Sequence, residues 1–368
     1  MNKKYDFIIV GGGLAGATFA YYANKNNKRC LIIEKKKLGG SLECENIKDI
    51  PVHLYGPHIF HTSDKDIWDT VNNLTSFIPY INSPLANYNG SIIYNLPFNM
   101  NTFNTLWGAT TPNKAKEYLE DAKLKIENPV NLEEFVLSSV GREIYEIFIK
   151  GYTEKQWGKK CKDLPVDIIK RIPIRFTYNN NYFNDTYSGI PEKGYNELIQ
   201  KLTENCDITF CDYFTEKEYW DSLGHIIVYT GKIDEYFDYD LGELEYRSLY
   251  WIHDTIKNFN YQGNAVINYN SENVPYTRII EHKHFYNDLY IDNPYTVISK
   301  EYPIEYNKED NIPYYPINDK KNNDLYNEYK ERTPDNVLFI GRLAEYKYYN
   351  MDQLMIRIRD IWNEYNLI

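Results

Sequence analysis

The first forty residues constrain the fold of this chain more than any other stretch. A short apolar run over residues 5–10 meets a glycine-rich turn, and a helical pattern follows. A second apolar run over 30–33 then ends at the carboxylate of Glu34. The turn carries the GxGxxG spacing of Gly11, Gly13 and Gly16. This order and length of elements predict a dinucleotide-binding unit, which consists of a strand, a glycine turn, a helix, a second strand and an acidic residue.

Each glycine of this turn has a separate physical reason. Gly11 allows the tight turn, Gly13 lets the backbone approach a pyrophosphate, and Gly16 lets the helix pack closely on the sheet. The start of the helix offers free N–H groups to phosphates, and Glu34 can accept hydrogen bonds from ribose hydroxyls. The alternative is a glycine-rich turn in some other α/β protein.

Length and charge limit the classes of protein. A chain of 368 residues predicts two or three domains. The net charge of −11 without a basic block argues against a nucleic-acid partner. No apolar run reaches the roughly 20 residues that a membrane span needs. The chain enters a strand at once, and its five scattered cysteines lack a CxxC pair. We therefore expect a cytoplasmic protein with reduced thiols and no metal site.

The middle of the chain changes from helical to β-rich patterns. Residues 101–170 read as helical, with Asn131 as an N-cap and Glu134 three positions later. Gly151 is a natural helix stop, which would place Tyr152 and Trp157 just beyond a helix end.

Short β-rich runs dominate from about residue 175 to 306, and we expect a second, antiparallel sheet there. The run over 226–231 resembles a strand that returns to the nucleotide sheet. Residues 337–340 read as another strand, and a helix follows from Asp352. That late helix could complete the cofactor site with its N-terminus.

Several polar residues stand in unusual apolar surroundings. His58 and His61 follow a Gly-Pro turn without a third ligand at metal spacing. They could contact a flavin or a sugar, or be satisfied core histidines. Arg171 and Arg278 lie among apolar neighbours and need an anionic partner, either a diphosphate or an internal carboxylate. Tyrosines at turns could donate to a sugar nucleotide or simply pack.

Taken together, these segments resemble the bacterial type of UDP-galactopyranose mutase. The strings that carry the resemblance span residues 11 to 350 in order. They are GGGLAG, YGPHIFHT, NSPLA, NLPFNMNTF, KGYTEKQWG, IIKRIPIRF, NNNYFNDTYSGIP, LEYRSL, GNAVIN, VPYTRIIEHKHF, PYYPIND and GRLAEYKYYN.

The resemblance implies an α/β protein of three domains. A discontinuous Rossmann-type FAD-binding domain would comprise residues 1–80, 190–245 and 330–368. A helical domain would comprise 100–170. A twisted antiparallel sheet for the substrate would comprise 81–99, 171–189 and 246–329. Relatives of this kind are mostly homodimers.

The resemblance also implies a reaction. UDP-galactopyranose and UDP-galactofuranose would be interconverted without net redox change, with N5 of reduced FAD as nucleophile at the anomeric carbon. NAD(P)H or another external reductant would keep the flavin reduced. UDP leaves and returns, so cationic and phenolic groups should hold its diphosphate.

Residue roles carry over motif by motif. The catalytic positions implied are His61, Arg171 and Arg278. The substrate-binding positions implied are Asn82, Tyr152, Trp157, Tyr182, Asn268, Tyr314 or Tyr315, and Tyr348. The cofactor-binding positions implied are Gly11, Gly13, Leu14, Ala15, Gly16, Glu34, Lys35, Gly40, Ser41, His58, Ile59, Gly341, Arg342, Asn350 and Met351.

Two positions depart from the family pattern. Ser41 stands where the family usually has Asn, and Asn350 where it usually has Asp. Three alternatives stay open: a mutase for an N-acetylated or 6-deoxy nucleotide sugar, a flavin oxidoreductase of the amine-oxidase type, which shares the Rossmann opening, and a non-catalytic descendant that binds a sugar nucleotide, which only these two departures support.

Overall fold

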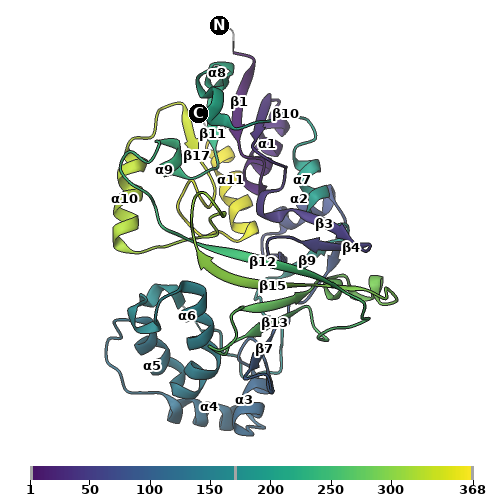
Figure 1. The fold of residues 1–368 in the computed structure, drawn as a ribbon, viewed down its shortest axis with the longest axis vertical. Helices are drawn as coiled ribbons and strands as arrows, with labels where there is room; N and C mark the ends of the chain where they lie inside the picture. The colour runs from purple at the N-terminus through teal and green to yellow at the C-terminus, as the bar shows by residue number, and fades with distance from the viewer. Residues whose placement is uncertain (1–2, 170–171, 366–368) are drawn as a thin grey trace.

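A five-stranded parallel sheet organises the upper part of the molecule (Figure 1). The computed structural model describes residues 3–169 and 172–365. From edge to edge the strands are β10 (Asp207–Phe210), β2 (Cys30–Glu34), β1 (Tyr5–Val10), β11 (Gly224–Tyr229) and β17 (Val337–Phe339). Because β11 pairs directly with β1, the predicted return of residues 226–231 to the nucleotide sheet is confirmed.

Helices cover both faces of this sheet, because its central strands are apolar on both sides. Phe7, Ile9 and Val228 pack on one face, and Ile8 and Tyr229 pack on the other. The helices of the first face are α1 (Leu14–Lys25), α2 (Lys65–Leu74), α7 (Tyr195–Leu202) and α11 (Met351–Tyr365). Beyond the other face lie α8 (Lys217–Leu223), α9 (Ile233–Tyr236) and α10 (Lys320–Glu331).

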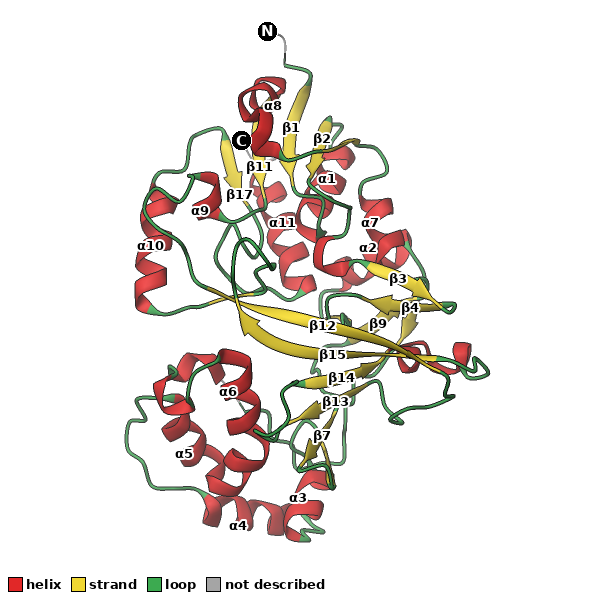
Figure 2. Ribbon diagram, viewed as in Figure 1, coloured by secondary structure: helices red, strands yellow, loops and turns green. Residues whose placement is uncertain are grey.

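A second sheet of seven strands crosses the middle of the molecule (Figure 2). In order they are β16 (Tyr315–Pro316), β12 (Tyr246–Ile256), β15 (Thr296–Glu305), β14 (Arg278–Glu281), β13 (Val266–Tyr269), β7 (Leu85–Tyr88) and β8 (Ile92–Asn95). The predicted antiparallel pairing is correct except between β13 and β7, which run parallel. This pair joins segments about 180 residues apart, so no hairpin dictates its direction.

Two small sheets lie next to these layers. One is the hairpin of β3 (Cys44–Ile47) and β4 (Ile50–His53), and the other contains β5 (Phe60–Thr62), β9 (Tyr187–Pro191) and β6 (Phe77–Pro79). Short 3₁₀ segments cover Gly40–Leu42, Cys161–Asp163, Val166–Ile169, Tyr213–Glu216 and His282–Tyr290.

A cluster of helices lies beside the second sheet, at the lower left of Figure 1. Its members are α3 (Met100–Trp107), α4 (Pro112–Ala122), α5 (Leu132–Ile144), the π-helical turn η2 (Tyr145–Lys150) and α6 (Gly151–Trp157). The predicted N-cap is confirmed, because the Asn131 side chain accepts a 2.9 Å hydrogen bond from the Glu134 N–H. Among the described residues, no helix combines the length and the apolar character needed to cross a bilayer.

The predicted helix stop at Gly151 is wrong. Gly151 has helical angles (φ −63°, ψ −37°), and the chain continues through α6 to Trp157. The helix ends instead at Gly158, whose φ of +66° is left-handed. A Cβ on Gly151 would lie only 2.1 Å from the backbone oxygen of Asn270, so this glycine permits a close approach to the sheet rather than a turn.

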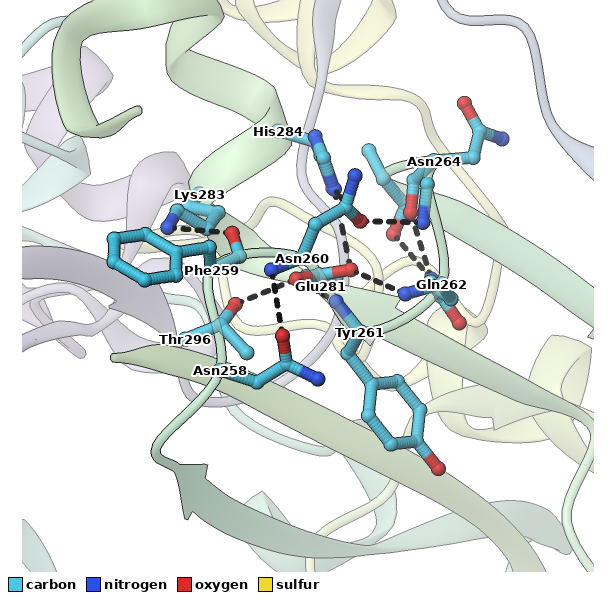
Figure 3. Close-up of polar contacts among 12 residues, drawn as sticks. Asn258, Phe259, Asn260, Tyr261, Gln262, Asn264, Glu281, Lys283, His284 and Thr296 are labelled. Atoms are coloured by element: carbon cyan, nitrogen blue, oxygen red, sulfur yellow. Dashed lines mark hydrogen bonds and ion pairs between the residues drawn. The ribbon is translucent and has the colours of Figure 1, made fainter. Parts of the chain in front are cut away.

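The far end of the second sheet is held by a buried carboxylate (Figure 3). The side chain of Glu281 is fully buried, and its carboxylate accepts hydrogen bonds from the N–H groups of Tyr261 and Gln262, each at 2.8 Å. The Thr296 hydroxyl donates a third at 2.7 Å. Lys283 holds the same loop through the Phe259 carbonyl at 2.9 Å. Charge-assisted bonds of this kind fix the connection between β12 and β13.

Candidate active site and cofactor cradle

The glycine turn after β1 leaves open space at one position only. Gly11 has φ +103°, and a Cβ there would lie 2.1 Å from Oγ1 of Thr230. A Cβ on Gly16 would lie 2.0 Å from the Gly11 carbonyl oxygen. A Cβ on Gly13 would meet nothing nearer than 3.9 Å, at Gly39 and Gly40. The protein itself does not require glycine at 13, so the space it leaves suits a closely approaching pyrophosphate.

The groups around this space fit a dinucleotide. No side chain caps α1, so its first residues, Leu14 and Ala15, begin the helix with the N-terminal partial charge facing the turn. Glu34 is held by its own loop: its carboxylate accepts from Gly12 N–H at 2.8 Å and Lys36 N–H at 2.9 Å. The neighbouring Lys35 forms an exposed ion pair with Asp212 at 2.6 Å.

His58 presents a buried polar atom to the same region. Among the described residues, nothing within hydrogen-bond distance pairs with its Nε2. Burial, followed by the charge of Arg342, lowers the pKa of His58 to about 4. The backbone of Ser41 and the charge of Arg278 also reach the ring. The neutral imidazole can therefore form a hydrogen bond with a bound group. Residues from motifs far apart in the chain lie close to this ring.

The C-terminal motif closes the cradle. Gly341 has φ +104° and donates its N–H to Glu345 at 3.0 Å. The guanidinium of Arg342 donates to the Tyr349 carbonyl at 2.9 Å and lies 4.6 Å from the centre of the Tyr348 ring. Asn350 and Met351 then lead into α11. Ile59, which follows His58 in the chain, is buried.

A cleft of about 1500 Å³ opens between the helical cluster, the second sheet and the C-terminal motif. Its walls contain seven residues that the sequence singled out, namely Tyr152, Trp157, Tyr182, Asn268, Tyr315, Tyr348 and Asn350. Burial raises the pKa values of Tyr152, Tyr182 and Tyr315, so these phenols keep their protons and can donate hydrogen bonds.

Arg278 has an internal partner, which is one of the two possibilities that its sequence context allows. Its Nε and Nη2 both donate to Oε2 of the buried Glu301, at 2.8 and 2.5 Å. Burial lowers the pKa of Arg278, but the charge and hydrogen bond of Glu301, together with the neighbouring phenols Tyr152 and Tyr315, raise it overall. Tyr152 and Tyr315 also interact with the arginine charge, so the guanidinium lies beside the cleft wall.

Among the described residues, Tyr314 and Asn82 were predicted for the site but are not part of the cleft lining. Tyr314 is buried, and its hydroxyl accepts from Nε1 of Trp251 at 3.1 Å, so Tyr315 is the member of the pair that lines the cleft. Asn82 is buried with an unpartnered Oδ1 among the described residues. Arg171 falls outside the residues that the structure describes.

His61 lies on β5 and is held from two sides. Its Nδ1 lies 2.7 Å from Asp185, and its ring stacks on Phe183 with 3.7 Å between centroids. Asp185 also accepts from the Ser63 hydroxyl at 3.1 Å. The carboxylate of Asp185 therefore orients the imidazole.

Sequence reasoning missed Arg247, a buried arginine of β12. Its Nε donates to the Gln156 carbonyl at 3.1 Å, and burial lowers its pKa. It lies directly across the strand pair from Tyr315. The available signal was an arginine in the LEYRSL string of the β-rich region, similar to the arginine within a β-rich run that pointed to Arg278.

Fold and site define a protein class: a dinucleotide-binding α/β protein whose cradle opens onto an aromatic cleft with adjacent cationic side chains. Comparison with known proteins narrows the class. The model of the UDP-galactopyranose mutase family matches residues 147–348, and that of an NAD(P)-binding Rossmann-like domain matches 9–74. The chain belongs to the UDP-galactopyranose mutase family.

Similar proteins carry two different substrate names. The dTDP-fucopyranose mutase of Escherichia coli is 38% identical over 372 residues, covering 96% of this chain and 95% of the relative. A probable UDP-galactopyranose mutase of Klebsiella pneumoniae is also 38% identical, covering 96% and 92%.

Solved structures share the fold. A reduced UDP-galactopyranose mutase gives a TM-score of 0.76 at 14% identity, covering 99% of this chain and 94% of that one. A putrescine oxidase bound to putrescine gives a TM-score of 0.59 at 8% identity, covering 99% of both chains. At these identities the likeness shows the shared fold.

Proposed function

We propose that this protein is a flavin-dependent isomerase that interconverts UDP-galactopyranose and UDP-galactofuranose. One observation carries the proposal: a single cleft collects Tyr152, Trp157, Tyr182, Tyr315 and Tyr348 from four separate segments, beside an arginine and the dinucleotide cradle. A nucleoside diphosphate needs this combination of aromatic faces, phenolic donors and positive charge.

FAD is the proposed cofactor. The open space at Gly13, the uncapped start of α1, the carboxylate of Glu34 and the unpartnered Nε2 of His58 fit its pyrophosphate, ribose and ring polar groups. Reduced FAD supplies a nucleophilic N5 to this chemistry. The reductant is proposed to be NAD(P)H or another external donor.

Different side chains of the cleft are proposed to bind different parts of the substrate. Tyr152 and Trp157 are proposed to hold the uracil, and Asn268 a polar edge of the substrate. Arg278 and the phenol groups of Tyr315 and Tyr348 would hold the diphosphate, with Tyr182 and Arg171. Holding the diphosphate throughout lets the nucleotide leave the sugar without escaping to solvent.

His61 is the proposed catalytic residue nearest the sugar. The contact between Nδ1 and Asp185 occupies one ring nitrogen and leaves Nε2 for the substrate. That nitrogen can accept a proton from a sugar hydroxyl.

A 6-deoxy sugar carried on dTDP is the second candidate substrate. The E. coli relative named for dTDP-fucopyranose is as similar in sequence as the Klebsiella relative named for UDP-galactopyranose. The two substrates differ in the base, in the ribose 2′-hydroxyl and at C6 of the sugar, so the same diphosphate clamp would serve both.

The proposal is tested with FAD-loaded protein reduced by dithionite. UDP-galactofuranose and dTDP-fucofuranose are supplied in parallel, and pyranose products are separated by chromatography. We expect conversion of UDP-galactofuranose at the higher kcat/KM. A higher value for the dTDP sugar selects the second candidate. Substrate-driven oxygen consumption without isomerisation would instead indicate amine-oxidase chemistry, and nucleotide binding without turnover a non-catalytic protein.

We also propose the domain division, with the Rossmann-type part at 1–80, 190–245 and 330–368. Support comes from the separate sheets and the separate buried helical cluster. A cytoplasmic homodimer is proposed on the family resemblance alone. Light scattering of the purified protein tests the oligomeric state.

A further inference from the structure

The connection between β13 and β14 carries unusual hydrogen bonding. It runs over residues 270–277, and on the two flanking strands Asn268 and Arg278 are cross-strand partners. Both residues belong to the proposed substrate site. The position of this connection therefore controls the position of one wall of the cleft.

One side chain from the opposite wall enters this connection. Nζ of Lys155, on α6, donates to the carbonyl oxygens of Tyr269 at 2.6 Å and of Ser271, Val274 and Tyr276 at 3.0 Å each. An ammonium has three N–H bonds for these four acceptors. Burial lowers the pKa of Lys155 to about 8, so at pH 7 the ammonium is the main form.

The connection meets this helical segment at two further points, one on α6 and one on the preceding turn η2. Gly151, four residues before Lys155, allows Asn270 to approach so closely that a Cβ would lie 2.1 Å from its oxygen. The Asn270 amide donates to the Phe148 carbonyl at 3.3 Å. Tyr152 and Trp157, on the same short helix, line the cleft.

We propose that Lys155 is a positioning residue that sets the distance between the two walls of the substrate cleft. Its ammonium ties the helix carrying Tyr152 and Trp157 to the hairpin carrying Asn268 and Arg278. Without that charge, four carbonyls lose their common donor, and the two walls are free to separate. This inference rests on the proposed function, since its readout is nucleotide binding.

The test compares two lysine variants of the FAD-loaded protein. Lys155→Met keeps an unbranched apolar stem but removes the donor. Lys150→Met is the matched control, because Lys150 pairs with Glu272 of the same connection at 3.0 Å, at the surface. UDP dissociation constants are measured by calorimetry, and kcat and KM with reduced protein.

We expect Lys155→Met to weaken UDP binding and raise KM about 10- to 100-fold, as misplacement of binding groups by about 1 Å does. Its flavin content should stay unchanged, because the hydrogen bonds that Lys155 donates within the described residues all go to carbonyls between residues 269 and 276 and none goes to the cradle. Lys150→Met should bind UDP like the unchanged protein. For Lys155→Ala, propylammonium in the buffer should restore part of the lost affinity, whereas sodium at equal ionic strength should not.

The outcomes separate the two proposals. If the unchanged protein does not bind UDP, the proposed function fails. If it binds UDP and Lys155→Met binds equally well, Lys155 has no positioning role. If Lys155→Met does not fold, Lys155→Gln, which keeps two donors without charge, decides: an unchanged dissociation constant overturns the inference and a raised one supports it.

Discussion

Single residues in this protein carry roles that follow from burial. His58 shows this most clearly, because its ring is neutral and buried at the junction of three motifs. Arg278 shows it in a second way. The sequence context could not distinguish a phosphate from a carboxylate as its partner, and the fold supplies Glu301. The remaining guanidinium edge and the adjacent phenols are what the proposed diphosphate would meet.

The buried His58 predicts a pH dependence of stability. Its pKa of about 4 in the folded protein lies below its ordinary 6.5, so between these values the unfolded chain binds more protons. The contribution of the neutral ring to the free energy of unfolding is complete above pH 6.5 and is lost as the pH falls toward 4. By pH 5 the loss is about 2 kcal/mol. Urea unfolding at pH 7.5 and 5.0 measures this loss, and His58→Gln should reduce it. Equal losses in both proteins would exclude His58 as the source.

Alanine substitutions at two glycines of the first turn should affect the stability of the flavin-free protein differently. Gly13→Ala should leave the stability of the flavin-free protein unchanged, because a Cβ fits there and φ is −77°. It should weaken FAD binding roughly tenfold or more, since crowding of this kind costs about 1–3 kcal/mol. Gly11→Ala should instead destabilise the flavin-free protein. Flavin absorbance per chain and urea unfolding distinguish the two. Full flavin content in Gly13→Ala would show that no pyrophosphate approaches position 13.

At the scale of elements, α6 is the helix whose end the local sequence pattern predicted incorrectly. A glycine after a run of apolar residues ordinarily ends a helix. Here the helix continues, because Gly151 faces the sheet and the close approach of Asn270 requires a residue without a Cβ. The end falls at Gly158, where the positive φ favours glycine. Tyr152 and Trp157 are therefore held on a helix rather than on a loop.

This reading of α6 predicts the effect of two alanine substitutions. Gly151→Ala should lower the free energy of unfolding by about 1–3 kcal/mol through crowding against Asn270, despite the higher helix propensity of alanine. Gly108→Ala is the comparison, because a Cβ there meets nothing within 4 Å and only its φ of +64° opposes the change. That strain costs about 1 kcal/mol. Thermal and urea unfolding of both variants measure the difference, and a stabilised Gly151→Ala would contradict the close approach.

At the scale of the whole molecule, the cleft depends on parts that meet only after folding. The helical cluster, the second sheet and the C-terminal motif each contribute one wall. The chain has a net charge of −11, yet Arg278, Arg247 and Arg342 lie in or beside this region. An anionic ligand is therefore attracted locally despite the overall charge.

A ligand that touches all three walls should stabilise the whole fold. At 100 times its dissociation constant, UDP should raise the free energy of unfolding by about 2.7 kcal/mol. Chemical denaturation of the FAD-loaded protein with and without UDP measures the rise. Uridine at the same concentration should stabilise less, because it lacks the diphosphate. Equal effects of the two ligands would argue against the arginine and tyrosine clamp.

The sequence by itself determined the dinucleotide unit and the family, because both depend on local patterns. The glycine turn, its flanking strands and Glu34 lie within thirty-five residues, where spacing dictates structure. Only the tertiary structure decided that Tyr315 rather than Tyr314 faces the cleft, that Glu301 partners Arg278, and that Lys155 enters the β13–β14 connection. These outcomes depend on pairings between segments 23 to more than 100 residues apart. Packing and burial choose such partners, and no local periodicity encodes that choice.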